Sequence, residues 1–303
     1  MAKRQGSAHG RAAPLLFLLP AAVLFTLFLL IPIGYAIELS LHALRVRGGL
    51  IGQRREVYVG LENYRSTLSD PELWHSLQRM LVYGAIVVPV MLGLALIFAL
   101  MLDTPATRFG RFSRLAIFLP YAVPGVIASL LWGFLYLPGV SPIRYVAEHM
   151  GLPAPNFFGV HSIFGSVSNI AVWGGVGFNM VVLYTSLRAI SGEIYDAARV
   201  DGCNELQIAL RIKIPLLSPA LIMTTVFSLI ATLQVFNEPM TLSPLTNVIY
   251  STWMPLMKVY RDAFVDGDIY SAAATSVVLA IATLVVSLGV LRLFQSRAFS
   301  EDR

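Results

Sequence analysis

Long hydrophobic runs alternate along this chain with shorter stretches that carry its charge. A helix needs about 20 apolar residues to cross the roughly 30 Å hydrocarbon core of a bilayer. Each run is long enough to span, and none of them contains Asp, Glu, Lys or Arg. The pattern therefore predicts an all-α membrane protein with six transmembrane helices, at 14–37, 81–102, 115–138, 163–187, 216–236 and 269–291.

The first run could also be a secretory signal, because Lys3, Arg4 and Arg11 precede it. The apolar region of such a signal covers about 7–15 residues and leads to a cleavage site of small residues. This run is longer, is interrupted by Pro20 and Pro32, and lacks a convincing cleavage site. We therefore expect it to be retained as a span.

Proline and glycine recur within the predicted spans. Backbone groups freed by such residues must be satisfied by neighbouring helices. Kinks at Pro120 and Pro124 would suit a helix that lines a cavity, but both residue types are also common in ordinary membrane helices. The sequence leaves these two interpretations open.

Composition supports a membrane protein, since hydrophobic residues make up 56% of the chain and charged residues 13%. Soluble domains carry about 25% charged residues. The net charge of +5 is explained by Lys and Arg on cytoplasmic loops, so we do not expect a nucleic-acid partner. Cys203 is the only cysteine, which excludes an intrachain disulfide.

The distribution of basic residues predicts the orientation. With both termini in the cytoplasm, the inner segments 1–13, 103–114, 188–215 and 292–303 hold 13 of the 22 Lys and Arg residues. The outer segments hold the other nine in a greater total length, and long loops follow the positive-inside rule weakly. The short segment 103–114 is the clearest, with Arg108, Arg111 and Arg114 against Asp103 alone.

One inner segment, 192–215, is charged and capable of forming helix. Residues 192–200 predict a short helix in which Asp196 and Arg199 are spaced to pair on its surface. Gly202 suits the left-handed geometry that ends a helix, and Pro215 suits the start of the next span. An ordinary amphipathic interfacial helix would look similar.

This segment resembles the cytoplasmic "EAA" coupling loop of ABC-importer permeases, which reads Glu-Ala-Ala, three residues, Gly, nine residues, Ile-x-Leu-Pro. The chain has Asp196 in place of Glu and Ile214 in place of Leu. In that family the loop docks onto a separate ATPase. The resemblance implies docking residues at Asp196, Ala197, Ala198, Asp201, Gly202, Ile212 and Pro215.

Further stretches resemble the carbohydrate-importer branch, the maltose F-type and glycerol-phosphate A-type permeases. They are Val59–Tyr64 with Asp70–Trp74, Phe118–Pro124 with Leu131–Phe134, and Trp173 with Gly177–Met180. The chain departs from the family at Asn237–Thr241, where a Thr-Gly-Gly-Pro segment is common, so the shape of the predicted outer loop 237–268 stays open.

The resemblance implies the type I ABC-importer permease fold in a bacterial inner membrane. Its domain would cover 14–295, including the coupling loop 192–215, between cytoplasmic tails at 1–13 and 296–303. Expected partners are a second six-span permease in a heterodimer, ABC ATPase subunits, an extracytoplasmic solute-binding protein and membrane lipid. No cofactor or metal is expected on this chain, because ATP and Mg²⁺ would bind the ATPase.

Polar side chains in two spans form the candidate solute site. Thr224, Ser228 and Thr232 recur every four residues and share one helix face, with Gln234 close by. Positions that contact substrate in the family correspond to Gly175, Phe178, Ser228 and Thr232, and Asn179 adds an amide. These hydroxyls could equally bond to their own backbone or join helices.

Three functions fit an integral membrane protein of this kind. The leading one is the permease of an ATP-driven importer of sugars or sugar-like solutes, including glycerophosphodiesters, which works by alternating access. It would be no enzyme itself, since no Walker A motif is present.

A secondary, ion-coupled transporter is the alternative, although the predicted spans lack ionisable groups for a proton relay. An intramembrane hydrolase is disfavoured because no G-x-S-x-G or H-E-x-x-H motif occurs. The solute is not identified.

Overall fold

A computed structural model of the protein describes residues 9–47, 53–104 and 109–298. Most of the predicted N-terminal tail, the end of the predicted C-terminal tail, and Arg108 therefore lie outside the described residues. The chain divides into two compact units, residues 1–70 with 259–279 and residues 71–258 with 280–303. Each unit is described by itself.

The first unit contains the first predicted span and the segment that follows it. The candidate span runs over Leu16–Ser40, three residues beyond the predicted end, so it includes Glu38. Its elements are α1 (His9–Phe25), a π-helical turn (Thr26–Leu30), α2 (Ile31–Ser40), β1 (His42–Arg47), β2 (Gln53–Tyr58), α3 (Glu62–Ser69), a second π-helical turn (Arg261–Val265) and the start of α15 (Ile269–Ala298).

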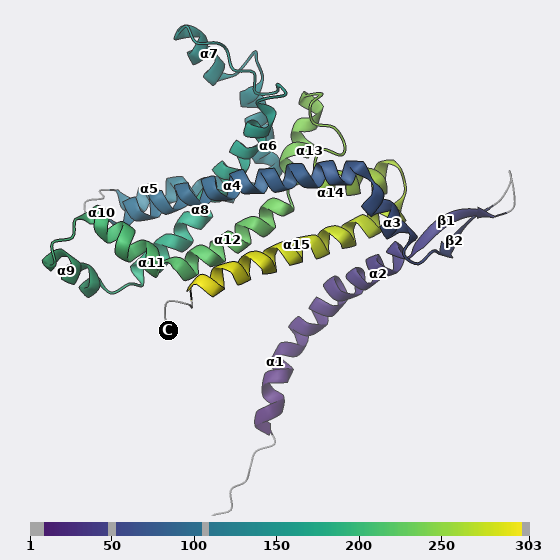
Figure 1. Ribbon diagram of the computed structural model, residues 1–303, viewed down its shortest axis with the longest axis horizontal. Helices are drawn as coiled ribbons and strands as arrows, with labels where there is room; N and C mark the ends of the chain where they lie inside the picture. Colours follow the sequence, from purple (N-terminus) through teal and green to yellow (C-terminus); the bar gives the residue numbers. More distant parts are fainter. Residues whose placement is uncertain (1–8, 48–52, 105–108, 299–303) are drawn as a thin grey trace, which may run out of the picture. The chain divides into compact units, whose positions relative to one another are not determined.

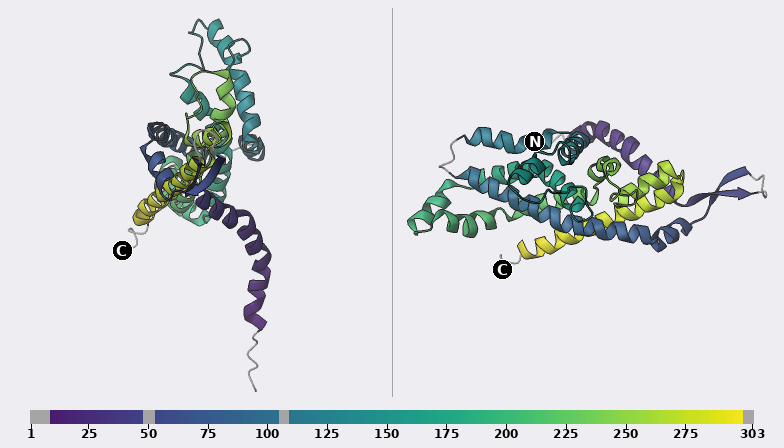
Figure 2. Two further views of the ribbon diagram at one scale, coloured as in Figure 1. Left: turned by 90° about the vertical axis from the view of Figure 1, so that its right-hand side faces the viewer. Right: turned by 90° about the horizontal axis from the view of Figure 1, so that it is seen from above.

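The strands β1 and β2 add a short hairpin to the predicted helical membrane fold. They pair antiparallel, with His42 opposite Tyr58 and Val46 opposite Arg54 (Figure 2). Asn63, on α3, holds the junction between α2 and β1. Its side-chain amide donates to the carbonyls of Ser40 and His42 at 2.8 and 2.7 Å. The hairpin gives no clear signal in the sequence, because its residues are too polar to stand out beside the apolar spans.

The second unit contains the other long helices and the candidate site. Its elements are α4 (Pro71–Asp103), α5 (Gly110–Phe118), a 3₁₀ turn (Leu119–Ala122), α6 (Gly125–Tyr136), α7 (Pro142–His149), α8 (Ile163–Arg188), α9 (Gly192–Val200), α10 (Glu205–Ile208), a π-helical turn (Ala209–Lys213), α11 (Ile214–Leu216), α12 (Ser218–Leu233), α13 (Asn237–Leu242), a 3₁₀ turn (Ser243–Leu245), most of α14 (Pro255–Tyr260) and the later part of α15.

Helices long and apolar enough to span a membrane match all six predictions. Among the described residues five are single candidate spans, one of which has a short non-helical step at residues 234–236, and the sixth is a sharply bent pair, α5 with α6. In lipid a helix satisfies its own backbone, which is why these apolar runs are helical. The boundaries differ most for α4, which begins ten residues before the predicted 81, and for the fifth span, which continues from α12 to Leu245.

The third span is sharply bent near Pro120 and Pro124, which agrees with the first of the two interpretations that the sequence left open. The segment Gly110–Ala122, which includes the 3₁₀ turn, and α6 are bent by 98° relative to each other, with the break at Val123 and Pro124. The bend is visible between α5 and α6 in Figure 1. Pro120 sits in the 3₁₀ turn, and Pro124 immediately precedes α6. Because proline favours helix starts and disfavours helix interiors, the two prolines divide this span into two helices.

Two hydrophobic clusters hold the second unit together. α4 packs along α8, and α12 packs against α4 and α8. One cluster lies around Tyr83, Met254 and Trp253, and the other around Met91, Met180 and Leu183.

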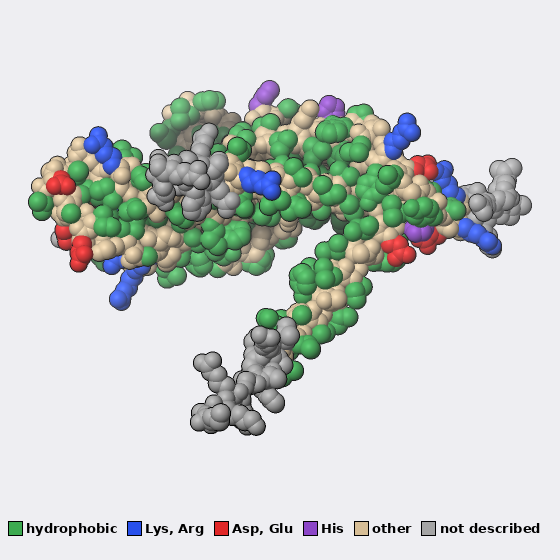
Figure 3. Space-filling model, turned by 60° about the horizontal axis from the view of Figure 1, so that its bottom comes forward, with side chains coloured by type: hydrophobic (Ala, Val, Ile, Leu, Met, Phe, Trp, Pro, Cys, Tyr) green, Lys and Arg blue, Asp and Glu red, His purple; other side chains and the backbone are tan. Residues whose placement is uncertain are grey.

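On the face drawn in Figure 3, hydrophobic side chains cover much of the surface, and charged side chains gather at the left-hand end, where α9 and α10 lie.

Candidate functional site: a coupling segment and a cavity

The predicted coupling segment forms two short helices joined by a tight turn. Ser191 caps α9, because its hydroxyl accepts a hydrogen bond from the Glu193 N–H at 3.4 Å. Gly202 has a φ of +83°, the left-handed conformation expected from the sequence. The N–H of Gly202 bonds to the Arg199 carbonyl, and the N–H of Cys203 to the Ala198 carbonyl. This pair of bonds is a Schellman motif, which satisfies the last carbonyls of α9.

The start of α10 is fixed by a capping box. The Asn204 side chain accepts from the Gln207 N–H, and the Gln207 side chain accepts from the Asn204 N–H, both at 2.8 Å. Two orphan backbone donors are thereby satisfied together. The turn between the helices is consequently defined on both sides by hydrogen bonds.

Arg199 links the two helices. Its guanidinium pairs with Asp196 at 3.0 Å, as the spacing predicted, and also with Glu205 on α10 at 3.1 Å. The hydrogen bond and the charge of Glu205 raise the pKa of Arg199 above its ordinary value, so it stays charged. All three side chains are well exposed, which makes this a surface network open to a partner.

A buried ion pair fastens the segment to the ends of two spans. Lys213 Nζ lies 2.6 Å from Asp103 Oδ2, and both side chains are less than a tenth exposed. Arg188, at the end of α8, lies 3.8 Å from the other Asp103 oxygen. No sequence pattern predicts this cluster, because Asp103 and Lys213 are 110 residues apart.

Tyr195, on α9, packs against the Lys213 end of this ion pair. The Lys213 ammonium lies 4.9 Å from the centre of its ring, a cation–π distance. Its hydroxyl is buried and has no hydrogen-bond partner among the described residues. Burial, and to a lesser degree the negative charge of Asp103, raises the pKa of Tyr195, so its hydroxyl stays protonated.

The predicted docking residues differ in exposure. Asp196, Ala197, Asp201, Gly202 and Pro215 are exposed, and Ile212 is half-buried. Ala198 is 6% exposed and packs inside the segment, so only one of the two alanines faces outward. Large apolar side chains on the same segment are exposed as well: Ile194, Val200, Leu206 and Leu210.

All six predicted solute residues line one cavity of about 460 Å³. They are Gly175, Phe178, Asn179, Ser228, Thr232 and Gln234, contributed by α8 and the fifth span. The volume lies within the roughly 300–1,000 Å³ usual for small-molecule sites. Pro120, Tyr121 and Gly125 also line it, so the bend between α5 and α6 forms one wall, the role that the kinks suggested.

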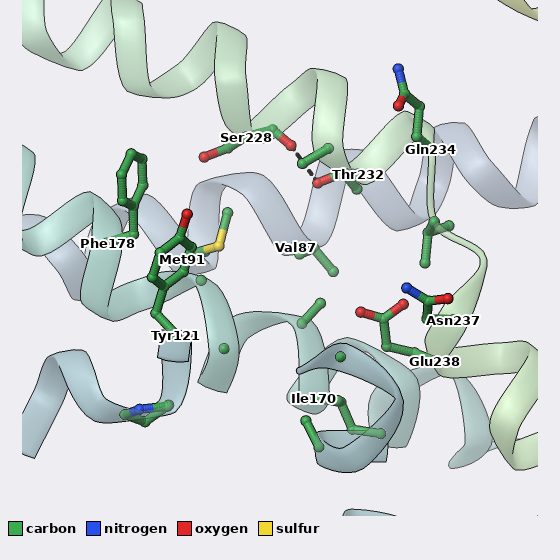
Figure 4. Close-up of a pocket in the computed structure, with 18 of the residues that line it drawn as sticks. Val87, Met91, Tyr121, Ile170, Phe178, Ser228, Thr232, Gln234, Asn237 and Glu238 are labelled. Atoms are coloured by element: carbon green, nitrogen blue, oxygen red, sulfur yellow. Dashed lines mark hydrogen bonds between the residues drawn. The ribbon is translucent and has the colours of Figure 1, made fainter. Parts of the chain in front are cut away.

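The hydroxyls of the predicted stripe are already engaged. Thr232 donates to the Ser228 carbonyl at 2.6 Å (Figure 4), and Thr224 to the Ala220 carbonyl at 2.9 Å. Ser228 donates to the Asn179 side chain at 3.3 Å, which joins α12 to α8. These contacts are the ones that the alternative interpretation of the stripe describes, but each hydroxyl oxygen can still accept a hydrogen bond, so a role in solute binding stays a prediction.

An aromatic wall and a polar end of the cavity were missed from sequence. Tyr121 stacks on Phe178 with ring centres 5.0 Å apart. Asn237 and Glu238 lie at the other end of the cavity, near Gln234 (Figure 4). The expectation that the spans contain no ionisable residue is wrong here, because the fifth candidate span runs on through α13, after the non-helical residues 234–236, and includes Glu238. The earlier boundary placed this residue in an outer loop.

Comparisons with known proteins identify the family. No protein-family model matches the chain. A lactose transport system permease protein, LacF of Rhizobium radiobacter, is 30% identical over 289 residues, which cover 93% of both chains. The chain belongs to the permeases of binding-protein-dependent ABC transporters. A glycerol-3-phosphate transport permease, UgpA of Yersinia pseudotuberculosis, is 27% identical to this permease and covers 92% of both chains.

Solved structures agree on the fold. A bacterial alginate ABC transporter, solved in complex with an alginate pentasaccharide-bound periplasmic protein, has a chain that matches this permease with a TM-score of 0.80. The match covers 98% of this chain and 99% of that chain at 18% identity, so it shows the type I importer permease fold alone.

Family membership settles several expectations. The permease is a multi-pass protein of the bacterial inner membrane and works with an ATPase and a periplasmic binding protein. Permeases of this family are not catalytic and carry no cofactor, because a separate subunit hydrolyses ATP. Among the described residues, no group of three His, Cys, Asp or Glu side chains is placed to hold a metal ion.

Proposed function

We propose that this permease pairs with a second six-span permease, and that segment 192–215 couples its spans to the ATPase. In this proposal both termini are cytoplasmic, the permease domain covers 14–295, and the tails are 1–13 and 296–303. Asp196, Ala197, Asp201, Gly202, Ile212 and Pro215 form the docking surface, and Ala198 supports it from inside. ATPase closure pushes the segment, and the spans turn around the cavity.

The observation that carries this proposal is the ion pair of Lys213 with Asp103. A push on α9 can move the spans only if the segment is attached rigidly to them. The pair is buried and links the segment to the end of α4, and Arg188 adds the end of α8. Exposed apolar side chains beside a charged network provide the mixed surface that protein partners use.

Gly202→Arg tests the coupling role. Open space surrounds this glycine in the structure, so the added side chain projects outward into the proposed interface. We expect uptake to fall by at least about tenfold, which corresponds to about 1.4 kcal/mol lost at the interface. The amount of permease inserted in the membrane should not change. Uptake at the unmodified level would contradict the coupling role.

Gly151→Arg is the matched control for this experiment. Gly151 also has a positive φ, +71°, and nothing within 4 Å of an added Cβ. It lies outside the coupling segment, after α7. Both substitutions therefore impose similar backbone strain, and only Gly202→Arg should stop transport.

The solute in this proposal is a sugar or sugar-like molecule that occupies the cavity. Phe178 and Tyr121 offer a flat apolar surface, and Asn179, Ser228, Thr232 and Gln234 supply polar groups around it. Gly175 also lines the cavity and allows Met91 to pack closely against α8, since an added Cβ there would lie 2.2 Å from the Met91 sulfur. A mostly apolar cavity with a few convergent polar groups is typical of small-molecule sites. The lactose and glycerol-3-phosphate systems named for the relatives point to the same size class.

A pull-down of the tagged permease in mild detergent tests the assembly. Mass spectrometry should recover a second six-span permease and an ATPase with a Walker A motif. Recovery of this chain only with copies of itself would contradict the heterodimer and would favour a homodimeric importer.

A further inference from the structure

The cavity has an uncommon charge distribution. Glu238 is the one ionisable acid or base among the side chains that line it, apart from the phenols of Tyr83 and Tyr121, and no described Lys, Arg or His lines it. Glu238 is half-buried and forms no ion pair with any described basic residue. A buried or half-buried carboxylate without a cation is costly unless it is solvated or bound by a ligand.

The surroundings of Glu238 are suited to accept a polyol. In Figure 4 its carboxylate points into the cavity, beside the Asn237 amide and below Gln234. The buried hydroxyl of Tyr83, another lining residue, has no hydrogen-bond partner among the described residues. Carboxylate, amide and phenol groups together can accept and donate hydrogen bonds to several hydroxyls at once.

We infer that Glu238 sets the charge class of the solute, so that the cavity takes neutral or cationic sugars and rejects sugars that carry a carboxylate or phosphate. The inference rests on the proposed function, because it assumes that the solute passes through this cavity. A charged group that repels the wrong ligand is a common means of specificity. Sugar hydroxyls would donate to the carboxylate, whereas a solute anion would face its charge with no lining cation to offset it.

The inference separates this permease from systems that its relatives name. Glycerol 3-phosphate and the acidic polysaccharide alginate are anionic, whereas lactose is neutral. Sequence identity alone does not distinguish these classes, because the lactose and glycerol-3-phosphate relatives are 30% and 27% identical to the chain. The carboxylate in the cavity favours the neutral class.

Sugar binding to the purified importer tests the inference. The complex of permeases and ATPase is prepared without its binding protein, and dissociation constants are measured at pH 7 by saturation-transfer difference NMR. The probes are glucose and galactose, with the uronate and the 2-amino sugar of each. They keep the ring and change the charge. We expect the uronates to bind at least about tenfold more weakly than the neutral sugars, as charge repulsion in a partly desolvated site requires.

Three variants identify the residue responsible. Glu238→Gln removes the charge and keeps the shape, so the uronates should come to within about threefold of the neutral sugars, a residual below about 0.7 kcal/mol. Glu238→Asp keeps the charge, so the uronates should still bind more weakly than the neutral sugars. This result would show that a substitution at position 238 does not by itself abolish the difference by disturbing the fold. Glu148→Gln is the control, because Glu148 pairs with Arg144 on α7 and does not line the cavity. It should leave the ratio unchanged.

Each contrary result has a separate meaning. Equal binding of uronates and neutral sugars by the unmodified complex, or an unchanged ratio in Glu238→Gln, overturns the inference. Failure of all six sugars to bind also overturns it, provided that the binding protein still stimulates the ATPase of the same preparation. Absence of that stimulation contradicts the proposed function instead, and it is measured first.

Discussion

At the residue scale, Asp103 is the centre of the attachment between the coupling segment and the spans. Two cations share its carboxylate, Lys213 at 2.6 Å and Arg188 at 3.8 Å. Lys213 is nearly inaccessible, whereas the Arg188 side chain is 67% exposed and can be solvated. Loss of Asp103 therefore leaves a buried ammonium, but loss of Lys213 leaves a carboxylate that keeps a second cation.

This asymmetry gives a prediction for two single substitutions. Asp103→Asn should lower the free energy of unfolding by about 3–5 kcal/mol, the usual cost of a buried charge without its partner. Lys213→Met should cost less, because Arg188 still faces the carboxylate and the Met side chain fills similar space. Thermal unfolding of the detergent-purified permease measures both. Equal losses, or a greater loss in Lys213→Met, would show that Asp103 is not the shared anchor.

Sequence reasoning found the residues that act locally and missed those that act across the chain. The Asp196–Arg199 pair and the cap at Gly202 follow from spacings of a few residues, and the structure contains both. Asp103 gave no signal, since its partner is 110 residues away. Glu238 was visible in the sequence, but the apolar run stops at Phe236, and hydropathy does not show that a second helix, α13, extends the candidate span to Leu245.

At the element scale, the contact between α8 and the bent third span shapes one wall of the cavity. The ends of α5 and the 3₁₀ turn lie so close to α8 that a Cβ on Gly177 would fall 2.3 Å from the Ile117 oxygen and 2.7 Å from the Phe118 Cα. Both are backbone atoms, which cannot rotate away. The glycine is therefore required for this close approach, as small residues are at other membrane helix contacts.

Two glycine substitutions on α8 test this contact. Gly177→Ala should destabilise the permease by about 1–3 kcal/mol, since α5 must shift to admit the methyl group. Gly174→Ala, three residues earlier on the same helix, meets nothing within 4 Å and should gain up to about 1 kcal/mol from better helix propensity. Thermal unfolding in detergent compares the two. A neutral Gly177→Ala variant would contradict the close packing.

The six apolar runs were enough to predict the helices, but not the angle between α5 and α6. Prolines at 120 and 124 marked a possible break in this span, one of two interpretations that the sequence left open. The bend angle of 98° depends on the contacts of the two halves. The 3₁₀ turn packs against α8, and α6 packs against α13. Those contacts join residues far apart in sequence, so a single sequence gives the position of the break without its geometry.

At the scale of the whole molecule, the orientation in the membrane fixes how every site would work. The proposed mechanism needs segment 192–215 in the cytoplasm, where the ATPase is. Only a modest excess of basic residues on the inner segments supports that orientation, because the long predicted outer segment 38–80 also carries several arginines. A reporter inside the coupling segment itself would decide the question.

Cys203 provides that reporter, because it is the only cysteine of the chain and lies half-buried beside Gly202. A membrane-impermeant maleimide should label it in inverted membrane vesicles and not in intact spheroplasts. A second permease, with Cys203→Ser and Val160→Cys, should show the opposite pattern, since Val160 is 72% exposed in the predicted outer segment 139–162. Bound ATPase should slow the labelling of Cys203 in inverted vesicles, because docking covers the turn after α9. Labelling of Cys203 from the outside would reverse the topology and place the ATPase on the wrong side of the membrane for the proposed coupling.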